Sequence, residues 1–313
     1  MAPRTVCVLG GSGFVGQRVV HGLVQMGFSV CVPTRDRERA KEQLILLPTA
    51  DVLSADVHDP AQLEAVLEGM DAVINLIGVL QDHPKGSFQR NHVDLPLAVV
   101  GLCQRLGIAR LIHMSALNAS GTGTSRYLRS KGEGERIVRE AKGLAVTVFR
   151  PSVIFGAGDR FLTLFAKLAG VFPVFPLACA DARFQPIFVE DVARAMALSL
   201  TLPQTYGQAY DLCGPHVYTL RELVRYAAKQ AHTDPAIIGL PAWLGQLQAA
   251  VMEHLPGRLL TRDNLDSMKM DSVCNVPFPE IFGFSPMPLE AAAPQFLGGA
   301  TSRARYDRFR ARG

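Results

Sequence analysis

The sequence predicts an α/β fold, in which a doubly wound parallel sheet is followed by a smaller, mainly helical lobe at the C-terminal end. Two observations predict it. Over residues 1–155, short apolar runs alternate with segments of helical periodicity, as in parallel sheets that are covered by helices on both faces. In addition, the first apolar run, Val6–Leu9, ends in glycines and is followed at once by apolar residues at helical spacing.

Strands are expected wherever such an apolar run is short. Residues 71–78 are the clearest case, because this run is nearly unbroken, as in strands that are buried on both faces. Right-handed crossovers would align the carboxyl ends of the parallel strands along one edge, where ligands bind. The expected strands are 6–9, 28–33, 50–55, 71–78, 110–115, 145–150 and, as a later return to the sheet, 209–213.

Helices are expected between these strands, and Pro60 stands at the first position of one of them. From Pro151 onward, prolines and glycines divide the chain into shorter pieces. We therefore expect a first domain over residues 1–155 and a smaller substrate-side lobe over 156–313, with residues of about 184–213 returning to the sheet. Later helices are expected at 125–141, 161–169, 191–200, 220–230 and about 241–254.

The composition is that of a folded protein without an obvious macromolecular partner. Of 313 residues, 48% are hydrophobic and 19% are charged, and the net charge of +4 is too small and scattered to indicate nucleic acid. The six cysteines form no C-x-x-C pair and the eight histidines lack ligand spacing, so neither a disulfide framework nor a metal site is expected. Only five residues precede the first strand, which leaves no room for a leader and favours the cytoplasm.

Two surface features leave open a contact with a membrane, at its inner face, or with another protein. An apolar stripe at helical spacing either packs on the protein's own core or pocket, or rests on a bilayer or partner. An arginine-rich end is either a frayed, solvated tail or a contact for anionic lipid or an acidic partner. The stripe comprises Leu240, Trp243, Leu244, Leu247, Val251 and Leu255, and the arginines are Arg303, Arg305, Arg308, Arg310 and Arg312.

The glycine-rich turn after the first strand is the first candidate binding site. Such a strand–turn–helix unit uses one glycine for the sharp turn, one for close approach of a pyrophosphate and one for packing of helix on strand. The phosphates then meet the free N–H groups and positive dipole of the helix N-terminus. Glycine turns also serve structure alone, so this motif gains its weight from its place in the alternating sheet. The expected contacts are Gly10, Ser12, Gly13, Phe14, Val15 and Gly16.

Two further strand ends are expected to meet the adenosine half of a dinucleotide. After the second strand, an acidic residue would accept from the 2′-hydroxyl of NAD, whereas arginine pairs with the 2′-phosphate of NADP. Thr34 and Arg35 come first here and favour NADP(H), while Asp36 leaves NAD(H) open; a solvated charge run is the alternative. After the third strand, Asp56 and Val57 are placed to meet the adenine.

A second constellation predicts hydride-transfer chemistry. Tyr127 and Lys131 are one helical turn apart on the same face, and Ser115 ends the preceding strand. A phenol, with an ordinary pKa of about 10, becomes a useful acid or base at neutral pH when an ammonium group and a positive nicotinamide ring stabilise its phenolate. Tyr127 would be the acid/base, Lys131 would tune it and anchor the ribose, and Ser115 would orient a carbonyl. By itself, the Y-x-x-x-K spacing often arises by chance.

At this point the chain resembles the extended, or atypical, short-chain dehydrogenase/reductase family, which implies a Rossmann fold. The glycine turn matches the cofactor turn of that family, and Ser115, Tyr127 and Lys131 match its catalytic triad. Asn91 falls where many members carry a helix asparagine. The resemblance implies cofactor contacts from the loop after the fourth strand and from an R-P-x-x-x-F-G segment that covers the nicotinamide; these residues are Leu76, Ile77, Gly78, Pro151, Ser152 and Val153.

One branch is more closely similar: the NADPH-binding accessory subunits of respiratory complex I and their bacterial relatives. The strings that carry this resemblance are 112–119, 125–131, 159–162, 185–192 and 261–264, so it covers nearly the whole chain. It implies NADPH held largely as a structural ligand, and other relatives of the branch act near quinone synthesis. The missing leader and the short arginine-rich tail depart from the mitochondrial pattern and favour a free-standing bacterial-type protein.

Three functions are compatible with these patterns. The first is an NADP(H)-dependent oxidoreductase that acts on an apolar carbonyl or alcohol related to quinones or isoprenoids. The second is a non-catalytic, NADPH-stabilised scaffold or assembly protein of a respiratory or quinone-biosynthesis complex, with no small-molecule substrate. The third, a sugar-nucleotide epimerase or dehydratase, is weaker, because the expected pocket-side lobe is apolar and such enzymes, by the family resemblance, hold NAD.

Overall fold

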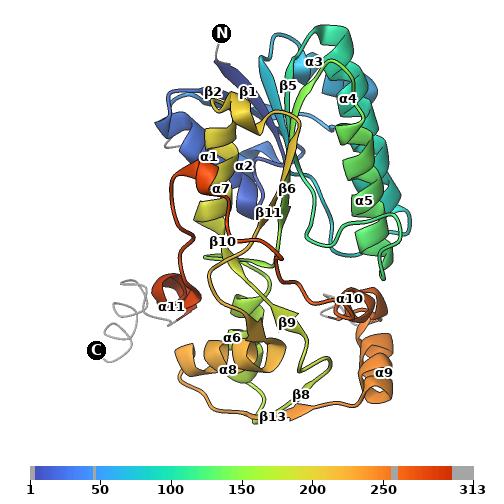
Figure 1. Cartoon of the computed structure of the whole chain (residues 1–313), viewed down its shortest axis with the longest axis vertical. Coiled ribbons are helices and arrows are strands. Elements are labelled where there is room, and N and C mark those ends of the chain that lie inside the picture. The colour runs from blue at the N-terminus through green and yellow to red at the C-terminus, as the bar shows by residue number, and fades with distance from the viewer. Residues whose placement is uncertain (1–3, 45–46, 255–259, 298–313) are drawn as a thin grey trace. The chain divides into compact units, whose positions relative to one another are not determined.

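The computed structural model describes residues 4–44, 47–254 and 260–297 (Figure 1). The chain forms two compact units, which are described separately here. The first contains the residues up to Pro151, together with Val189–Leu212 and Pro279–Phe284. The second contains Ser152–Phe188, Cys213–Phe278 and the residues from Ser285 onward. The first unit is therefore assembled from three separate stretches of sequence.

The first unit is built on a seven-stranded sheet in which every pairing is parallel, so the expected doubly wound fold is confirmed. The strand order is β11-β6-β5-β4-β1-β2-β3. Since β1 lies between β4 and β2, the order reverses beside it, and ligands of such folds bind at this reversal. The bounds are β1 (Thr5–Leu9), β2 (Ser29–Thr34), β3 (Ala50–Ser54), β4 (Ala72–Asn75), β5 (Arg110–Met114), β6 (Ala145–Pro151) and β11 (Gln208–Leu212).

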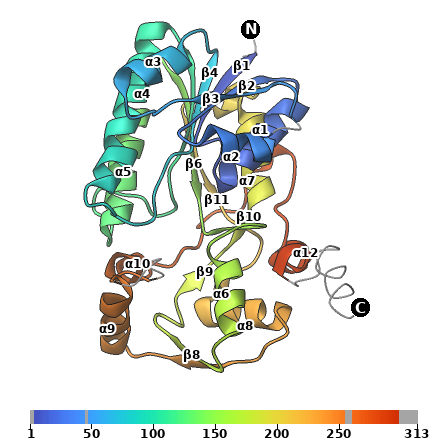
Figure 2. The ribbon, with the colours of Figure 1, turned by 180° about the vertical axis from the view of Figure 1, so that it is seen from behind.

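Helices cover both faces of this sheet. One face carries α1, α2 and α7, and the other carries α3, α4 and α5 (Figures 1 and 2). A core of fully buried side chains, among them Leu63, Leu67 and Leu111, fills the second of these interfaces. The helices are α1 (Phe14–Gln25), α2 (Arg37–Leu44), α3 (Pro60–Leu67), α4 (Leu95–Leu106), α5 (Arg126–Arg139) and α7 (Val189–Ser199), with a π-helical turn at Gln89–Asp94 that leads into α4.

The second unit combines short strand pairs with helices around a separate apolar core. Its strand pairs are β7 (Ile154–Phe155) with β10 (Ile187–Phe188), β8 (Val174–Leu177) with β13 (Ala236–Gly239), and β9 (Arg183–Phe184) with β12 (Tyr218–Thr219). Its helices are α6 (Leu162–Ala169), α8 (Leu220–Gln230), α9 (Ala242–Met252), α10 (Arg262–Ser267), α11 (Leu289–Ala292) and α12 (Pro294–Leu297). Helix α8 begins at a reciprocal cap between Thr219 and Glu222, which fixes its start at the expected residue.

One expectation from the sequence is wrong: Cys213 and Cys274 form a disulfide within the second unit, with their Cα atoms 6.1 Å apart. Gln185 brings the two segments together, because its side chain donates to the carbonyl oxygen of Gly214 at 2.7 Å and accepts from the N–H of Cys274 at 3.0 Å. The partners are 61 residues apart, and their pairing depends on contacts that no spacing motif records.

Helix α9 contains most of the apolar stripe, and three of its bulky side chains face outward while Leu244 is half-buried. Trp243 is 68% exposed, and Leu247 and Val251 are each 56% exposed, whereas the small residues Gly245 and Ala249 are buried. Hydropathy could not separate these faces, because both are apolar. In the described part of the chain, every helix is too short or too polar to cross a membrane. Of the two other stripe residues, Leu240 precedes α9 and its N–H donates to the carbonyl oxygen of Leu177 at 2.9 Å, whereas Leu255 and the five arginines at 303–312 lie outside the described residues.

Candidate functional site

The turn between β1 and α1 has the geometry that a diphosphate requires. Gly10 adopts a left-handed φ of +82°, and the N–H of Gly13 donates to its carbonyl oxygen at 3.0 Å. A Cβ on Gly16 would stand 2.1 Å from that same oxygen, so helix and turn touch only because no side chain is there. Gly13 begins α1 without a side-chain cap. The first N–H groups of the helix, which have no intrahelical partner, therefore stay available to an anion.

The loop after β4 connects this turn to the second constellation. The N–H of Leu76 donates to the carbonyl oxygen of Leu9 at 3.0 Å, and Ile77 lies 3.2 Å from the point where a Cβ on Gly10 would stand. The corresponding point at Gly78 lies 3.6 Å from the Nζ atom of Lys131. The glycine turn, the loop and Lys131 thus form a continuous row along the carboxyl edge of the sheet. An extended dinucleotide would lie along such a row.

Lys131 and Ser115 lie close together in a buried environment. The Nζ atom of Lys131 donates to the carbonyl oxygen of Met114 at 2.6 Å, directly before Ser115. Burial lowers the pKa of Lys131 to about 8, against the opposing effect of Glu135. The Oγ atom of Ser115 is buried and has no hydrogen-bond partner in the described part of the chain. An unpaired buried hydroxyl is costly, which is consistent with a hydroxyl that is kept for a ligand.

Tyr127 departs from the expectation in one respect. Its ring meets the rings of Phe88 and His92 edge-on, with centroid separations of 6.0 and 5.7 Å. Burial raises the pKa of Tyr127 to about 12, instead of lowering it. In the protein alone, desolvation disfavours the phenolate form of Tyr127. The activating charge would therefore have to come from the nicotinamide ring.

Sequence reasoning singled out Asn91 and missed His92. The side chain of Asn91 bonds to other residues: its Nδ2 donates to the carbonyl oxygen of Ser87 at 2.7 Å, and its Oδ1 lies 3.1 Å from the Nε2 of His58. The adjacent His92 instead faces Tyr127 and is 2% exposed. The π-helical turn at Gln89–Asp94 changes which side chains point inward, and a π-helical turn has no reliable sequence signal.

The ends of β2 and β3 carry the groups that were expected to meet the adenosine. Arg35 is exposed and makes no ion pair within the residues described. Asp36 accepts from the N–H of Arg39 at 3.2 Å and so caps the start of α2.

After β3, Asp56 accepts from the N–H of His58 at 3.1 Å. Burial lowers the pKa of His58, and the charges of Arg90 and Arg35 lower it further, so both guanidinium groups act on this corner of the sheet. Beside it, Thr34 accepts from the N–H of Asp36 at 3.2 Å, and Val57 packs on the core.

The segment expected to cover the nicotinamide is divided between the two units. Pro151 ends β6 in the first unit, where its carbonyl oxygen accepts from the N–H of Leu117 at 3.0 Å. Ser152 and Val153 belong to the second unit, where the Oγ of Ser152 lies 2.9 Å from the carbonyl oxygen of Ser272. A contact between these two residues and the cofactor stays a prediction.

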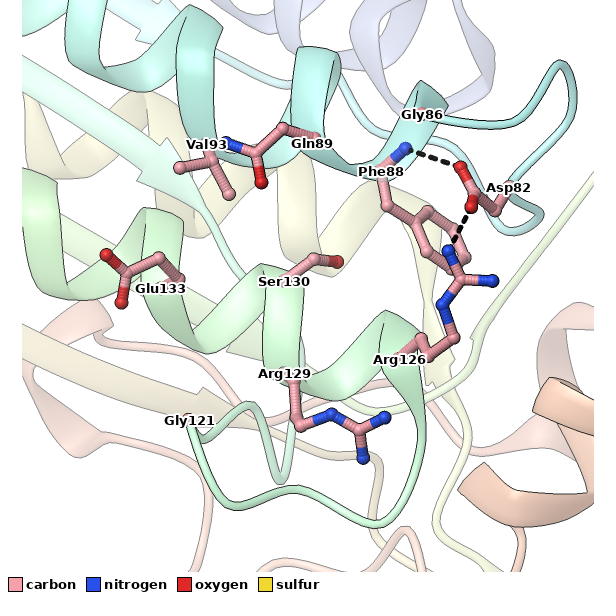
Figure 3. Close-up of a pocket in the computed structure, with 10 residues that line it drawn as sticks. All are labelled: Asp82, Gly86, Phe88, Gln89, Val93, Gly121, Arg126, Arg129, Ser130 and Glu133. Carbon is pink, nitrogen blue, oxygen red and sulfur yellow. Dashed lines mark hydrogen bonds and ion pairs between the residues drawn. The ribbon is translucent and has the colours of Figure 1, made fainter.

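A pocket of about 560 Å³ lies between the π-helical turn and α5, within the first unit (Figure 3). Arg126 forms an ion pair with Asp82 beside the ring of Phe88, and Asp82 also accepts from the N–H of Phe88. The hydroxyl of Ser130 points toward the same space from α5. The pocket is lined by Asp82, Gly86, Phe88, Gln89, Val93, Gly121, Arg126, Arg129, Ser130 and Glu133.

Together, the doubly wound sheet, the glycine turn and the Ser115, Tyr127 and Lys131 constellation define a Rossmann-type protein of the short-chain dehydrogenase/reductase class. The chain belongs to the NAD dependent epimerase/dehydratase family, whose model matches residues 6–213. That match includes the glycine turn, β11 and each residue of the constellation.

Relatives of the chain carry different names. It is 32% identical, over 301 residues, to "NADH dehydrogenase [ubiquinone] 1 alpha subcomplex subunit 9, mitochondrial" of Mus musculus, covering 93% of this chain and 78% of the relative. It is 30% identical, over 240 residues, to "Ceramide reductase" of Caulobacter vibrioides, covering 77% and 74%. Among solved structures, the NADPH-dependent quinone oxidoreductase QOR2 of Escherichia coli, complexed with NADPH, shares the fold with a TM-score of 0.74 at 19% identity, covering 93% of this chain and 99% of that chain.

Proposed function

We propose that the protein is an NADP(H)-dependent oxidoreductase that acts on an apolar carbonyl or alcohol. The observation that carries the proposal is the arrangement around β5: Lys131 donates to Met114, and the adjacent Ser115 has a buried hydroxyl without a partner in the described chain. A scaffold protein has no need of a buried, unpaired hydroxyl beside a buried ammonium, because both destabilise the fold.

The roles of the residues follow from their chemistry. Bound NADPH supplies the hydride for the carbonyl carbon. Ser115 donates a hydrogen bond to the carbonyl oxygen and orients it, and Tyr127 gives that oxygen its phenolic proton as the alcohol forms. Lys131 holds the ribose hydroxyls and favours the phenolate that remains. In the opposite direction the same phenolate accepts the proton of the alcohol.

The surroundings of Asp36 and Arg35 favour NADP(H) over NAD(H). Asp36, the residue that would bind the ribose of NAD, is engaged in capping α2. Arg35 is exposed without an ion pair in the described residues, whereas the nearby Arg90 is paired with Asp56 at 3.8 Å. An unpaired guanidinium at this strand end suits a 2′-phosphate, which NAD lacks.

An apolar substrate is supported by two of the compared proteins. One relative is named for the reduction of ceramide, and a solved structure of the same fold is named for the reduction of quinones. Ceramide carries long hydrocarbon chains, and quinones are carbonyl compounds. We therefore place a long-chain or quinone-like carbonyl first among candidate substrates, ahead of sugar nucleotides.

The test is NADPH oxidation across a panel of long-chain ketones, quinones and sugar nucleotides, with Tyr127→Phe compared with Tyr206→Phe. Tyr206 is the matched control, because its ring lies under Arg110 and its hydroxyl has no role in the proposal. Tyr127→Phe is expected to lower turnover at least 100-fold, while Tyr206→Phe leaves it within twofold. Unchanged turnover in Tyr127→Phe would refute the assignment.

A non-catalytic scaffold is the second candidate, and two observations favour it. The match to the mitochondrial complex I subunit covers 93% of this chain. In addition, Tyr127, with a pKa of about 12, is a poor base in the protein alone. A scaffold would bind NADPH tightly, gain thermal stability by mass action and show no turnover with any carbonyl. Rapid exchange and oxidation of the nucleotide would exclude it.

As for binding partners, we propose that the exposed face of α9 rests on the inner face of a lipid membrane. Residues 235–252 contain no charged side chain that could pair with a protein partner. The bulky residues Trp243 and Leu247 are exposed, and so is Ile238 on β13, the strand that precedes α9 in the chain. The five arginines near the end of the sequence would be attracted to anionic headgroups.

Cosedimentation with vesicles tests this surface. Wild-type protein is expected to sediment with vesicles that contain anionic phosphatidylglycerol, and Trp243→Ser with Leu247→Ser is expected to remain in the supernatant. Leu97→Ser is the control, since Leu97 is equally exposed but lies on α4. Wild-type protein that stays in solution would overturn the proposal.

A further inference from the structure

His92 is a buried ionisable residue that the proposed chemistry does not use. It is 2% exposed and belongs to the π-helical turn before α4. Its ring stacks on Phe88, with centroids 5.3 Å apart, and meets the ring of Tyr127 edge-on. A buried imidazole in contact with the candidate acid/base requires a physical explanation.

Its hydrogen bonds fix its tautomer. The N–H of Val79 donates to the Nε2 atom of His92 at 3.0 Å, so Nε2 carries no proton. The proton is therefore on Nδ1, which lies 2.8 Å from the Oγ of Ser130. Ser130 in turn donates to the carbonyl oxygen of Tyr127 at 2.9 Å. Each bond has one donor and one acceptor, and the chain runs from the loop after β4 to helix α5.

We propose that His92 is a positioning residue that ties the loop at Gly78 and Val79 to the helix carrying Tyr127 and Lys131. The inference rests on the proposed function and deepens it: His92 would hold the ribose-side loop and the acid/base at a fixed separation. The point where a Cβ on Gly78 would stand lies 3.5 Å from Nε2 of His92 and 3.6 Å from Nζ of Lys131. His92 therefore holds the loop through its hydrogen bond, and the loop lies next to the Lys131 ammonium.

Backbone packing supports the same connection. A Cβ on Gly134 would stand 1.8 Å from the carbonyl oxygen of His92, so α5 lies directly against the π-helical turn. The pocket in Figure 3 borders these contacts, because its walls include Phe88 and Ser130, which both contact the His92 ring. His92 is thus fixed by its backbone, its ring and both of its nitrogen atoms.

The surrounding charges keep His92 neutral. Burial, and then the charge of Lys131, lower its pKa to about 3, against the opposing effect of Asp82. The other ionisable groups that face it are Tyr127 and His113, and burial also holds the pKa of His113 well below its usual value. A protonated His92 would lose the bond from Val79 and would place a second cation beside Lys131. The neutral form alone can accept from Val79 while donating to Ser130.

The first test requires no cofactor. In protein with ¹⁵N-labelled histidine, long-range ¹H–¹⁵N spectra are expected to show His92 as the Nδ1–H tautomer, unchanged between pH 5 and pH 9. An imidazole that titrates in this range, or that carries its proton on Nε2, would overturn the inference. Hydrogen exchange at the Val79 N–H is expected to become at least 10-fold faster in His92→Phe, because that variant removes its acceptor.

The second test uses NADPH affinity and turnover in four variants. His92→Phe keeps a ring but loses both bonds, His92→Gln keeps a donor and an acceptor, and Ser130→Ala breaks one link. His21→Phe is the control, because His21 is exposed on α1. We expect His92→Phe to weaken NADPH binding and lower kcat about 10-fold, with Ser130→Ala intermediate and His92→Gln restoring most of the loss.

The outcomes separate the inference from the proposed function. Equal losses in His92→Phe and His92→Gln, or a change in thermal stability with no change in kcat or NADPH affinity, would overturn the positioning role. If wild-type protein bound NADPH but reduced no carbonyl, the oxidoreductase would fail, while NADPH affinity and exchange at Val79 would still decide the role of His92. If it bound no nucleotide, the NMR and exchange measurements alone would decide whether His92 ties the loop to the helix.

Discussion

The Nζ atom of Lys131 donates to the carbonyl oxygen of Met114 at 2.6 Å, and this bond joins the middle of α5 to the carboxyl end of β5. The bond places an ammonium beside Ser115 at the sheet edge where the glycine turn also lies. It also buries a charge, since Lys131 is 4% exposed. The hydrogen bond holds the site in place, whereas the burial of the ammonium that makes this bond destabilises the fold.

We expect that cost to appear as a pH dependence of stability. Burial lowers the pKa of folded Lys131 from 10.5 to about 8, so between these values the unfolded chain binds more protons and stability rises with pH. Relative to Lys131→Met, the free energy of unfolding of wild-type protein should rise by roughly 3 kcal/mol from pH 8 to pH 10.5. Urea unfolding without nucleotide measures it. The exposed Lys229→Met should differ from wild type by a constant amount, and a constant difference for Lys131→Met as well would contradict the prediction.

Arg35→Ala should weaken binding of NADPH about 10-fold or more and leave NADH binding nearly unchanged, because only NADPH carries the 2′-phosphate. Fluorescence titration with both nucleotides measures the ratio. Arg37→Ala is the matched control, since the Nε of Arg37 donates to the carbonyl oxygen of Val52 at 3.0 Å and serves the fold. Equal losses for the two nucleotides in Arg35→Ala would remove the 2′-phosphate role.

Gly134→Ala should destabilise the first unit by at least about 2 kcal/mol or prevent its folding, because the new methyl group would stand 1.8 Å from the carbonyl oxygen of His92. Gly101→Ala on α4, where the space is open, should instead stabilise the protein by roughly 0.5–1 kcal/mol through helix propensity. Thermal unfolding compares the two. If both variants gained stability, the close packing of α5 on the π-helical turn would be disproved.

Replacing Cys213 and Cys274 together by serine should lower the free energy of unfolding by roughly 2–4 kcal/mol, because the bond closes a long loop in the unfolded chain. Dithiothreitol should destabilise wild-type protein by a similar amount and leave the double variant unaffected. Cys179→Ser is the control, since that cysteine is free and half-buried. If dithiothreitol also destabilised the double variant, the Cys213–Cys274 disulfide would not be the cause of the destabilisation.

The sequence predicted local structure well where one pattern determined it. The apolar run at 71–78 contains β4, and the helix expected at 220–230 has the bounds of α8, because burial on two faces and helical periodicity are properties of neighbouring residues. It was wrong about the disulfide, since 61 residues separate Cys213 from Cys274. It expected an ammonium and a bound nicotinamide ring to lower the pKa of Tyr127; in the protein without nucleotide, burial raises that pKa to about 12, so the lowering by the nicotinamide ring stays a prediction.

By itself, then, the sequence determined the doubly wound sheet and the glycine turn, and it singled out Ser115, Tyr127 and Lys131 as candidate site residues. These features follow from periodicity and short-range spacing, which act between residues near in the chain. Only the tertiary structure decided that His92, rather than Asn91, faces Tyr127, that Asp36 caps a helix, and that the bulky side of α9 faces outward. Those outcomes depend on contacts between segments that are far apart in the chain. Polar groups lose their water only where such segments pack together, so local sequence patterns do not predict which groups are desolvated.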